Sequence, residues 1–176
     1  MAKKTKTYKI ELDKTKTKEE REYEGTREWS DYWRQNPHRF IADWIGFEGL
    51  TWYQDMILYI MFKVSVFFWI ACRGISKSYM IAWVLVAQCI LLPRSRFVIA
   101  SGTRGQARMV ITQKILGELY NRYPRIRQEI EEWSTSHNDT FVKFRGGSEI
   151  VVVTGSDSSR GNRACGVVYE EARTLT

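Results

Sequence analysis

The sequence predicts an α/β fold, in which a mainly parallel β-sheet is flanked by helices and preceded by a helical segment. Short apolar runs that suit strands alternate along the chain with longer segments whose apolar residues recur at helical spacing. This order is typical of parallel sheets. Of the 176 residues, 44% are hydrophobic and 14% are aromatic, so the chain is not wholly disordered. The length suits one domain, or one domain with a tail.

Residues 1–26 are rich in Lys, Glu and Thr and nearly free of core-forming side chains. We expect a flexible charged arm there, helical toward its end, followed by a domain over residues 27–176. The arm is either simply solvated or contacts DNA or a protein partner. It has no apolar signal core. The most apolar runs, 64–72 and 80–92, are shorter than the about 20 residues that span a bilayer, so we expect no membrane segment.

Charge and cysteine content restrict the class of protein. A formal net charge of +7 permits a nucleic acid or phosphate partner but does not establish one. The three cysteines are an odd number and include no CxxC pair. This pattern argues against a disulfide framework and against a structural zinc site. We therefore expect a reducing compartment.

The first elements of the domain are two predicted helices and a strand. Asn36 can cap a helix that begins at Pro37, and Gly46 can end it. Thr51 can cap a second helix that extends to about residue 62. The apolar run 65–71 then predicts a strand that is covered on both faces, as strands of parallel sheets are.

The same alternation continues after a short polar loop. An apolar helix is expected over residues 77–91, and it stops near Pro93. A second strand over 96–100 precedes a long helix over 103–120.

The last part of the domain is predicted to contain a hairpin and a final strand. Pro124 opens a short polar helix that extends to residue 132. Strands over 141–144 and 149–153 form a hairpin, because the Gly-Gly pair between them supplies positive φ at low steric cost. A polar loop then leads into the last strand, over 165–169.

The loop after the first predicted strand has features of a phosphate-binding loop. Lys77 and Ser78 begin an apolar helix, where backbone N–H groups and the helix dipole favour an anion. In this motif the lysine reaches the terminal phosphates and the hydroxyl holds Mg²⁺. The match is imperfect because Ala71 and Ser76 occupy the two glycine positions, so Ser76 is either strained or the loop differs locally. The alternative is an ordinary strand–turn–helix with a surface lysine.

Two carboxylates, Glu170 and Glu171, end the last predicted strand. In a parallel sheet this end would lie beside the phosphate loop. Adjacent strand residues point to opposite faces, so Glu170 can hold Mg²⁺ while Glu171 positions or deprotonates the attacking water. Taken alone, the pair is also explained by a solvated strand end. Lys77 and Ser78 would bind the phosphates and the metal ion, and the acidic pair would bind the metal ion and the attacking water, so the two segments would serve one reaction.

These segments resemble the N-terminal ATPase region of the large terminase subunit of tailed bacteriophages, the motor that packages double-stranded DNA. The resemblance is carried by residues 72–78 and 167–172. Segment 50–54 looks like the family's adenine-recognising segment, and 155–161 is similar to its polar Arg-Gly loop. The similarity covers about residue 36 to the end of the chain. It implies a P-loop NTPase-type sheet, and it implies that the protein binds ATP and Mg²⁺.

The resemblance also implies roles for individual residues. Arg73 and Arg160 are the candidates for stabilising the charge of the transition state. The alternative for Arg73 is a surface salt bridge. The alternatives for Arg160 are anchoring of its loop and a contact with DNA. Gln54 would read the adenine edge, or it is a polar position on a packed helix. The implied catalytic residues are Glu171, Lys77, Arg73 and Arg160. The implied nucleotide-binding residues are Gln54, Arg73, Gly74, Ile75, Ser76, Lys77 and Ser78, with Ser78 and Glu170 on the metal.

The implied function is ATP hydrolysis that drives double-stranded DNA into a procapsid. Partners would be the DNA backbone, a capsid portal, a small terminase subunit and further copies in a ring, in the host cytoplasm and transiently on the procapsid. The chain stops just after the acidic pair, so we expect an incomplete sheet without the family's coupling strand and nuclease domain. The alternatives are another helicase-like P-loop ATPase and a non-catalytic nucleotide-binding or assembly module.

The middle of the chain is basic. Its basic side chains either contact DNA phosphates or lie on a helix face that is exposed to solvent. Any DNA contact is expected to be independent of sequence and therefore sensitive to salt. The basic residues are Arg104, Arg108, Lys114, Arg122, Arg125 and Arg127.

Overall fold

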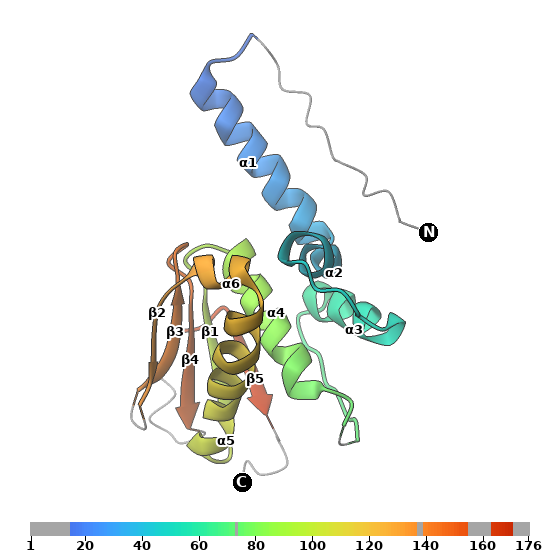
Figure 1. Ribbon diagram of the computed structural model, residues 1–176, viewed down its shortest axis with the longest axis vertical. Helices are drawn as coiled ribbons and strands as arrows, with labels where there is room; N and C mark the ends of the chain where they lie inside the picture. Colours follow the sequence, from blue (N-terminus) through green and yellow to red (C-terminus); the bar gives the residue numbers. More distant parts are fainter. Residues whose placement is uncertain (1–14, 73, 137–138, 155–162, 171–176) are drawn as a thin grey trace. The chain divides into compact units, whose positions relative to one another are not determined.

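The computed structural model describes residues 15–72, 74–136, 139–154 and 163–170. The chain divides into two compact units, Met1–Asn36 and Pro37–Thr176. One helix, α1 (Lys18–Gln35), is described in the first unit (Figure 1). Every described strand lies in the second unit.

Interactions within the helix itself stabilise α1. The Thr17 hydroxyl accepts a hydrogen bond from the Glu20 backbone N–H (3.3 Å), and the Glu20 carboxylate accepts one from the Thr17 N–H (2.9 Å). This reciprocal pair is a capping box. The hydrogen bond from the Thr17 backbone is the main reason that the pKa of Glu20 is lowered. No residue of α1 is buried, so the helix depends on its cap and on local ion pairs such as Lys18–Glu22.

Two helical segments open the second unit where the sequence predicts them. α2 (Pro37–Arg39) continues into the π-helix η1 (Phe40–Ile45), and Gly46 follows in a left-handed conformation with φ 89°. α3 (Trp52–Lys63) begins directly after the N-cap Thr51. Both predictions are confirmed because the residues that favour helix ends, namely proline, glycine and threonine, stand at those ends.

The sheet contains five strands in the described part of the chain. They are β1 (Arg96–Ser101), β2 (Ile130–Thr135), β3 (Thr140–Phe144), β4 (Glu149–Thr154) and β5 (Gly166–Glu170), and their order across the sheet is β2-β3-β4-β1-β5. β1 runs parallel to β4 and β5, whereas β3 is antiparallel to β2 and β4. The α/β class is confirmed, but the sheet is mixed rather than mainly parallel.

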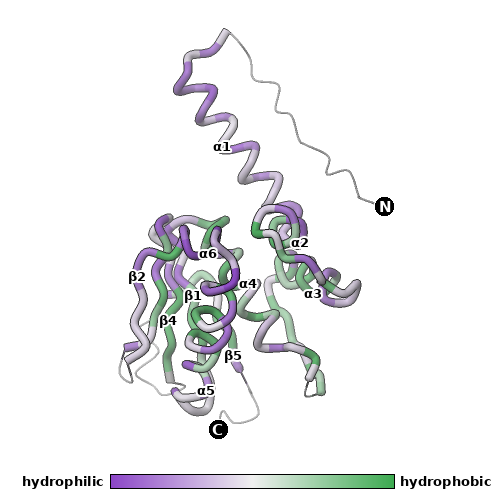
Figure 2. Tube along the Cα trace, in the orientation of Figure 1, coloured by the Kyte–Doolittle hydropathy of each residue, from purple (hydrophilic) through white to green (hydrophobic). Residues whose placement is uncertain are grey.

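Further helices pack beside the sheet: α4 (Lys77–Leu91), α5 (Arg104–Met109), η2 (Val110–Tyr120) and α6 (Pro124–Glu129). α4 packs against η2, and both lie on the same side of the sheet (Figure 1). Met80, Trp83 and Leu85 of α4 are at most 1% exposed. In Figure 2 the most hydrophobic stretches gather in this helix and in the central strands. Because α4 is buried in the core, its first turn has a fixed position beside the sheet.

The prediction of a strand over residues 65–71 is wrong for the structure as described. This segment pairs with no other described strand. Val66, Phe68 and Ile70 are 86%, 77% and 85% exposed, while Phe67 and Trp69 between them are half-buried. The side chains therefore alternate as in a strand, but a strand also needs a neighbour that accepts and donates its backbone hydrogen bonds.

The predicted polar helix is shorter than expected, and a strand was missed. α6 ends at Glu129 rather than at residue 132, and β2 follows at once. β2 is an antiparallel partner of β3, with an irregular register between Ile130 and Glu132. Local propensity favours a helix here, whereas the strand is created by a pairing partner further along the chain.

Among the described helices, none combines the length and the apolar character needed to cross a bilayer.

Candidate functional site

The loop before α4 has a strained backbone. Gly74 and Ser76 have positive φ values of 91° and 58°. Ser76 is the left-handed residue immediately before the helix, and its side chain makes no capping hydrogen bond. A left-handed residue other than glycine costs about 1–2 kcal/mol. Of the two alternatives left open by the sequence, strain at Ser76 is the one that the structure contains.

The Lys77 side chain folds back onto this loop. Its Nζ donates hydrogen bonds to the backbone carbonyls of Ala71 (2.6 Å) and Cys72 (3.1 Å). These acceptors carry only partial charge, so a phosphate oxygen would bind the ammonium group more strongly. The amine also belongs to the first turn of a helix, where the backbone favours an anion.

A hydrogen bond joins the start of α4 to the end of β5. The Ser78 hydroxyl donates to the carboxylate of Glu170, although the two residues are 92 positions apart in the sequence. Glu170 is the last residue of β5 and stands beside Ser101 of β1 in the parallel register. The structure therefore brings one residue of the predicted phosphate loop and one residue of the predicted acidic pair into direct contact.

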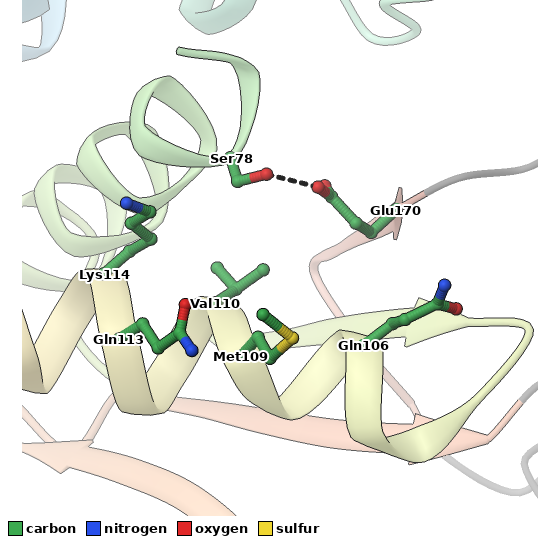
Figure 3. Close-up of a pocket in the computed structure, with 7 residues that line it drawn as sticks. All are labelled: Ser78, Gln106, Met109, Val110, Gln113, Lys114 and Glu170. Atoms are coloured by element: carbon green, nitrogen blue, oxygen red, sulfur yellow. Dashed lines mark hydrogen bonds between the residues drawn. The ribbon is translucent and has the colours of Figure 1, made fainter. Parts of the chain in front are cut away.

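The Ser78–Glu170 pair borders a cavity of about 190 Å³. Figure 3 shows Ser78 and Glu170 on one side of this cavity and residues of α5 and η2 on the other. The lining residues are Ser78, Gln106, Met109, Val110, Gln113, Lys114 and Glu170. A hydroxyl, a carboxylate, two side-chain amides and an amine therefore share this small space with the apolar side chains of Met109 and Val110.

The pair fits the expected Mg²⁺. A hydroxyl and a carboxylate are hard oxygen donors, and Mg²⁺ in nucleotide sites is commonly held by one or two such groups together with phosphates and water. Among the described residues, no group of three or more His, Cys, Asp and Glu side chains could hold a metal ion. Ser78 and Glu170 would thus hold the ion together with oxygen atoms of the nucleotide and of water.

Gln54 has a structural contact in this chain. Its side-chain carbonyl accepts a hydrogen bond from the Thr51 N–H (3.0 Å), which completes a capping box at the start of α3. The preceding loop is anchored to α4, since the Phe47 ring lies 6.2 Å from Tyr79 and 5.0 Å from Trp83 between centroids. Gln54 does not line the cavity beside Ser78.

Three of the predicted site residues, Arg73, Arg160 and Glu171, lie outside the described residues. The remaining loop positions are described: Gly74 is exposed and Ile75 is half-buried. The geometry of the site therefore rests on Lys77, Ser78 and Glu170.

Several of the basic residues in the middle of the chain are engaged in contacts within the protein. The Arg125 guanidinium donates to the Trp44 carbonyl and lies 5.5 Å from the centre of the Trp44 ring. Arg127 donates to the backbone carbonyls of Tyr120 (3.4 Å) and Asn121 (3.0 Å). These contacts favour a structural role for both arginines over contacts to DNA.

Sequence reasoning missed the wall of the cavity that α5 and η2 form. The lining residues there are Gln106, Met109, Val110, Gln113 and Lys114. Their spacing follows one side of a helix, which in sequence is indistinguishable from ordinary packing. The one available signal was Thr103, whose hydroxyl caps α5 and contacts Gln106.

The sequence matches no protein-family model and no curated protein. The resemblance to large terminase subunits therefore rests on the motif residues. The contact between Ser78 and Glu170 is a separate observation, because it depends on the fold and not on the motif pattern.

Proposed function

We propose that this chain is the nucleotide-binding part of an ATP-driven motor that moves double-stranded DNA into a viral procapsid. The observation that carries the proposal is the hydrogen bond between Ser78 and Glu170. Enzymes that hydrolyse nucleoside triphosphates through a phosphate loop place a loop hydroxyl and a strand-end carboxylate together on the metal ion. Lys77, in the same helical turn, supplies the cation for the phosphates.

The proposal includes a P-loop NTPase-type sheet, in which residues 65–71, which form no strand in the structure as described, lead into the phosphate loop. Support comes from two hydrogen bonds at the first turn of α4. Lys77 donates to the carbonyl of Ala71, at the end of the segment 65–71, and Ser78 donates to Glu170, at the end of β5. In the described part of the chain, β5 pairs only with β1, and residues 65–71 pair with no strand.

Each group has one task in the proposed reaction. Lys77 and the loop N–H groups bind the triphosphate, and Ser78 and Glu170 hold Mg²⁺, which neutralises charge on the phosphate oxygens when bound. Glu171 orients the attacking water, and Arg73 or Arg160 stabilises the charge that develops. Hydrolysis is coupled to movement of DNA, whose contacts are to the backbone and are independent of sequence. A ring of copies on a portal, with a small terminase subunit, would complete the motor.

A second candidate is a module that binds nucleotide or assembles with partners but does not hydrolyse ATP. Two observations favour it: Ser76 is strained where glycine is usual, and the Gln54 carbonyl is already used as a helix cap. Another P-loop ATPase of the helicase type would share the site but would not respond to a portal.

Phosphate release from Mg·ATP, measured with and without duplex DNA, tests the proposal. We expect release that DNA stimulates, and Glu171→Gln should slow it by roughly 10²–10⁴-fold while nucleotide binding is retained. Glu131→Gln, on the exposed part of β2, is the matched control and should turn over like the wild type. Unchanged turnover in Glu171→Gln would remove the assignment of that residue. Binding without any release would instead favour the non-catalytic module.

A further inference from the structure

Three exposed arginines stand where the parallel strands of the sheet begin. Arg94 lies a few residues before β1, Arg145 before β4 and Arg163 before β5. β4, β1 and β5 are neighbours in the sheet and run in the same direction, so they begin at one edge. The Cys165 N–H donates to the Arg96 carbonyl (2.7 Å), which ties the segment after Arg163 to the start of β1. We call Arg94, Arg145 and Arg163 the basic edge.

Backbone hydrogen bonds fix the turns that carry this edge. The Arg94 N–H donates to the Gly146 carbonyl (3.0 Å), which joins the turn before β1 to the turn before β4. The Arg145 N–H donates to the Glu129 carbonyl at the end of α6 (2.9 Å). In Figure 1, α6 and the turn between β3 and β4 lie at the opposite end of the sheet from the end of β5. The basic edge is therefore remote from the candidate nucleotide site.

The basic edge also differs from other basic groups of this unit in its lack of an acidic partner. Arg96 pairs with Glu149 (3.0 Å), and Lys143 pairs with Glu132 (2.7 Å). Within the described ranges of the chain, by contrast, no side chain of the basic edge forms an ion pair or a hydrogen bond. Like charges that are grouped without counter-charges repel one another, so an extended anion that meets all three is favoured there.

The conformation of Arg94 points in the same direction. Its φ of 60° lies in the left-handed region, where glycine would be unstrained. Strain of this kind is a reason to look for a function of the side chain. At Arg94 the side chain is exposed and charged, so a contact with an anion from outside the chain would give it such a function.

We infer that the basic edge binds the phosphate backbone of double-stranded DNA. The inference rests on the proposed function, which supplies DNA as the partner, and it names the residues that hold it. Neighbouring strands are about 4.8 Å apart, so the three strands span roughly 10 Å. Duplex DNA carries one negative charge for each 1.7 Å or so of its axis, so such an edge can face several phosphates. Arginine matches phosphate with its planar fork of N–H donors.

The position of the edge suggests how DNA and nucleotide are linked. β1 begins beside the basic edge and ends at Ser101, which is the register partner of Glu170 on β5. One strand of the core thus connects the proposed DNA surface with the proposed metal site.

Fluorescence anisotropy of a labelled duplex of mixed sequence, titrated with the full chain between about 50 and about 200 mM salt, is the test. For each phosphate contact that is lost, the slope of log affinity against log salt should become shallower by about 0.9. Arg145→Gln, Arg163→Gln and Arg94→Gly should each show this change, whereas Arg145→Lys keeps the charge and should keep the wild-type slope. Lys63→Gln removes an exposed charge at the end of α3 and is the matched control, with the wild-type slope expected.

The outcomes separate this inference from the function on which it rests. If the wild type binds the duplex but all three charge-removing variants keep the slope of Lys63→Gln, the basic edge is wrong and the proposed function stands. If the wild type does not bind the duplex at the lowest salt, the inference fails together with DNA as the partner, and Mg·ATP binding by the same samples reports separately on the nucleotide site. Arg94→Gly keeps the test valid should another variant not fold, because glycine suits that backbone conformation.

Poly-glutamate is the competing probe for an acidic protein partner. We expect it to bind more weakly than the duplex. Tighter binding of poly-glutamate than of the duplex, lost in the same arginine variants, would overturn the assignment to DNA.

Discussion

Replacing Ser76 with glycine should stabilise the protein, because Ser76 is held in the left-handed region at φ 58° and ψ 32°. Glycine adopts this conformation without steric strain, so the substitution removes about 1–2 kcal/mol of strain. The greater freedom of glycine in the unfolded chain offsets about 0.5–1 kcal/mol of this gain. The serine side chain makes no capping hydrogen bond, so none is lost. The expected net gain is about 0–1.5 kcal/mol, and its midpoint of about 0.75 kcal/mol corresponds to a rise in Tm of about 1.5–3 °C for a chain of this size.

The assay is urea unfolding with thermal melting on the same samples, and two variants serve as controls. Arg94→Gly replaces the other described non-glycine residue with positive φ (60°) and should also stabilise. Ser65→Gly replaces an exposed serine without positive φ and should slightly destabilise. A Ser76→Gly variant that is no more stable than Ser65→Gly would refute the argument from strain.

Two further predictions concern buried groups. Burial raises the pKa of the Cys89 thiol, whereas Cys72 and Cys165 are exposed. A thiol reagent should therefore label two sites in the native protein and the third only after unfolding, and rapid labelling of all three would contradict the described core. Burial also raises the pKa of Tyr123 to about 12. The unfolded chain, with a tyrosine pKa near 10, loses this proton first, so the free energy of unfolding should fall as pH rises from about 10 to about 12. Tyr123→Phe should flatten that dependence, and an unchanged slope would remove the assignment.

The helices were the most predictable part of the fold, because residues next to each helix end determine where the helix begins or stops. α4 has the predicted limits, since an apolar run stands between the polar loop at Ser76 and Pro93. α3 begins where Thr51 predicts. Thr103 likewise marks the start of the helix that α5 and η2 form. In each case one polar or conformationally restricted residue decides the boundary.

The pairing of strands was less predictable, because it depends on partners far away in the sequence. Residues 65–71 have the composition of a buried strand but lack a described neighbour, and β2 is polar yet pairs with β3. The sequence predicts that the end of the last strand lies beside the phosphate loop, but it does not predict the direct hydrogen bond between Ser78 and Glu170. The position of Gln106 at the cavity could not be expected, because it depends on how α5 packs against β1.

Calorimetric titration with Mg·ATP shows whether Lys77 belongs to a nucleotide site. We expect saturable binding by the wild type and no binding by Lys77→Ala. Lys143→Ala removes an exposed amine of β3 that pairs with Glu132 of β2, and this variant should bind like the wild type. Equal binding of Mg·ATP by the wild type and Lys77→Ala, or no binding by the wild type, would contradict the assignment of Lys77.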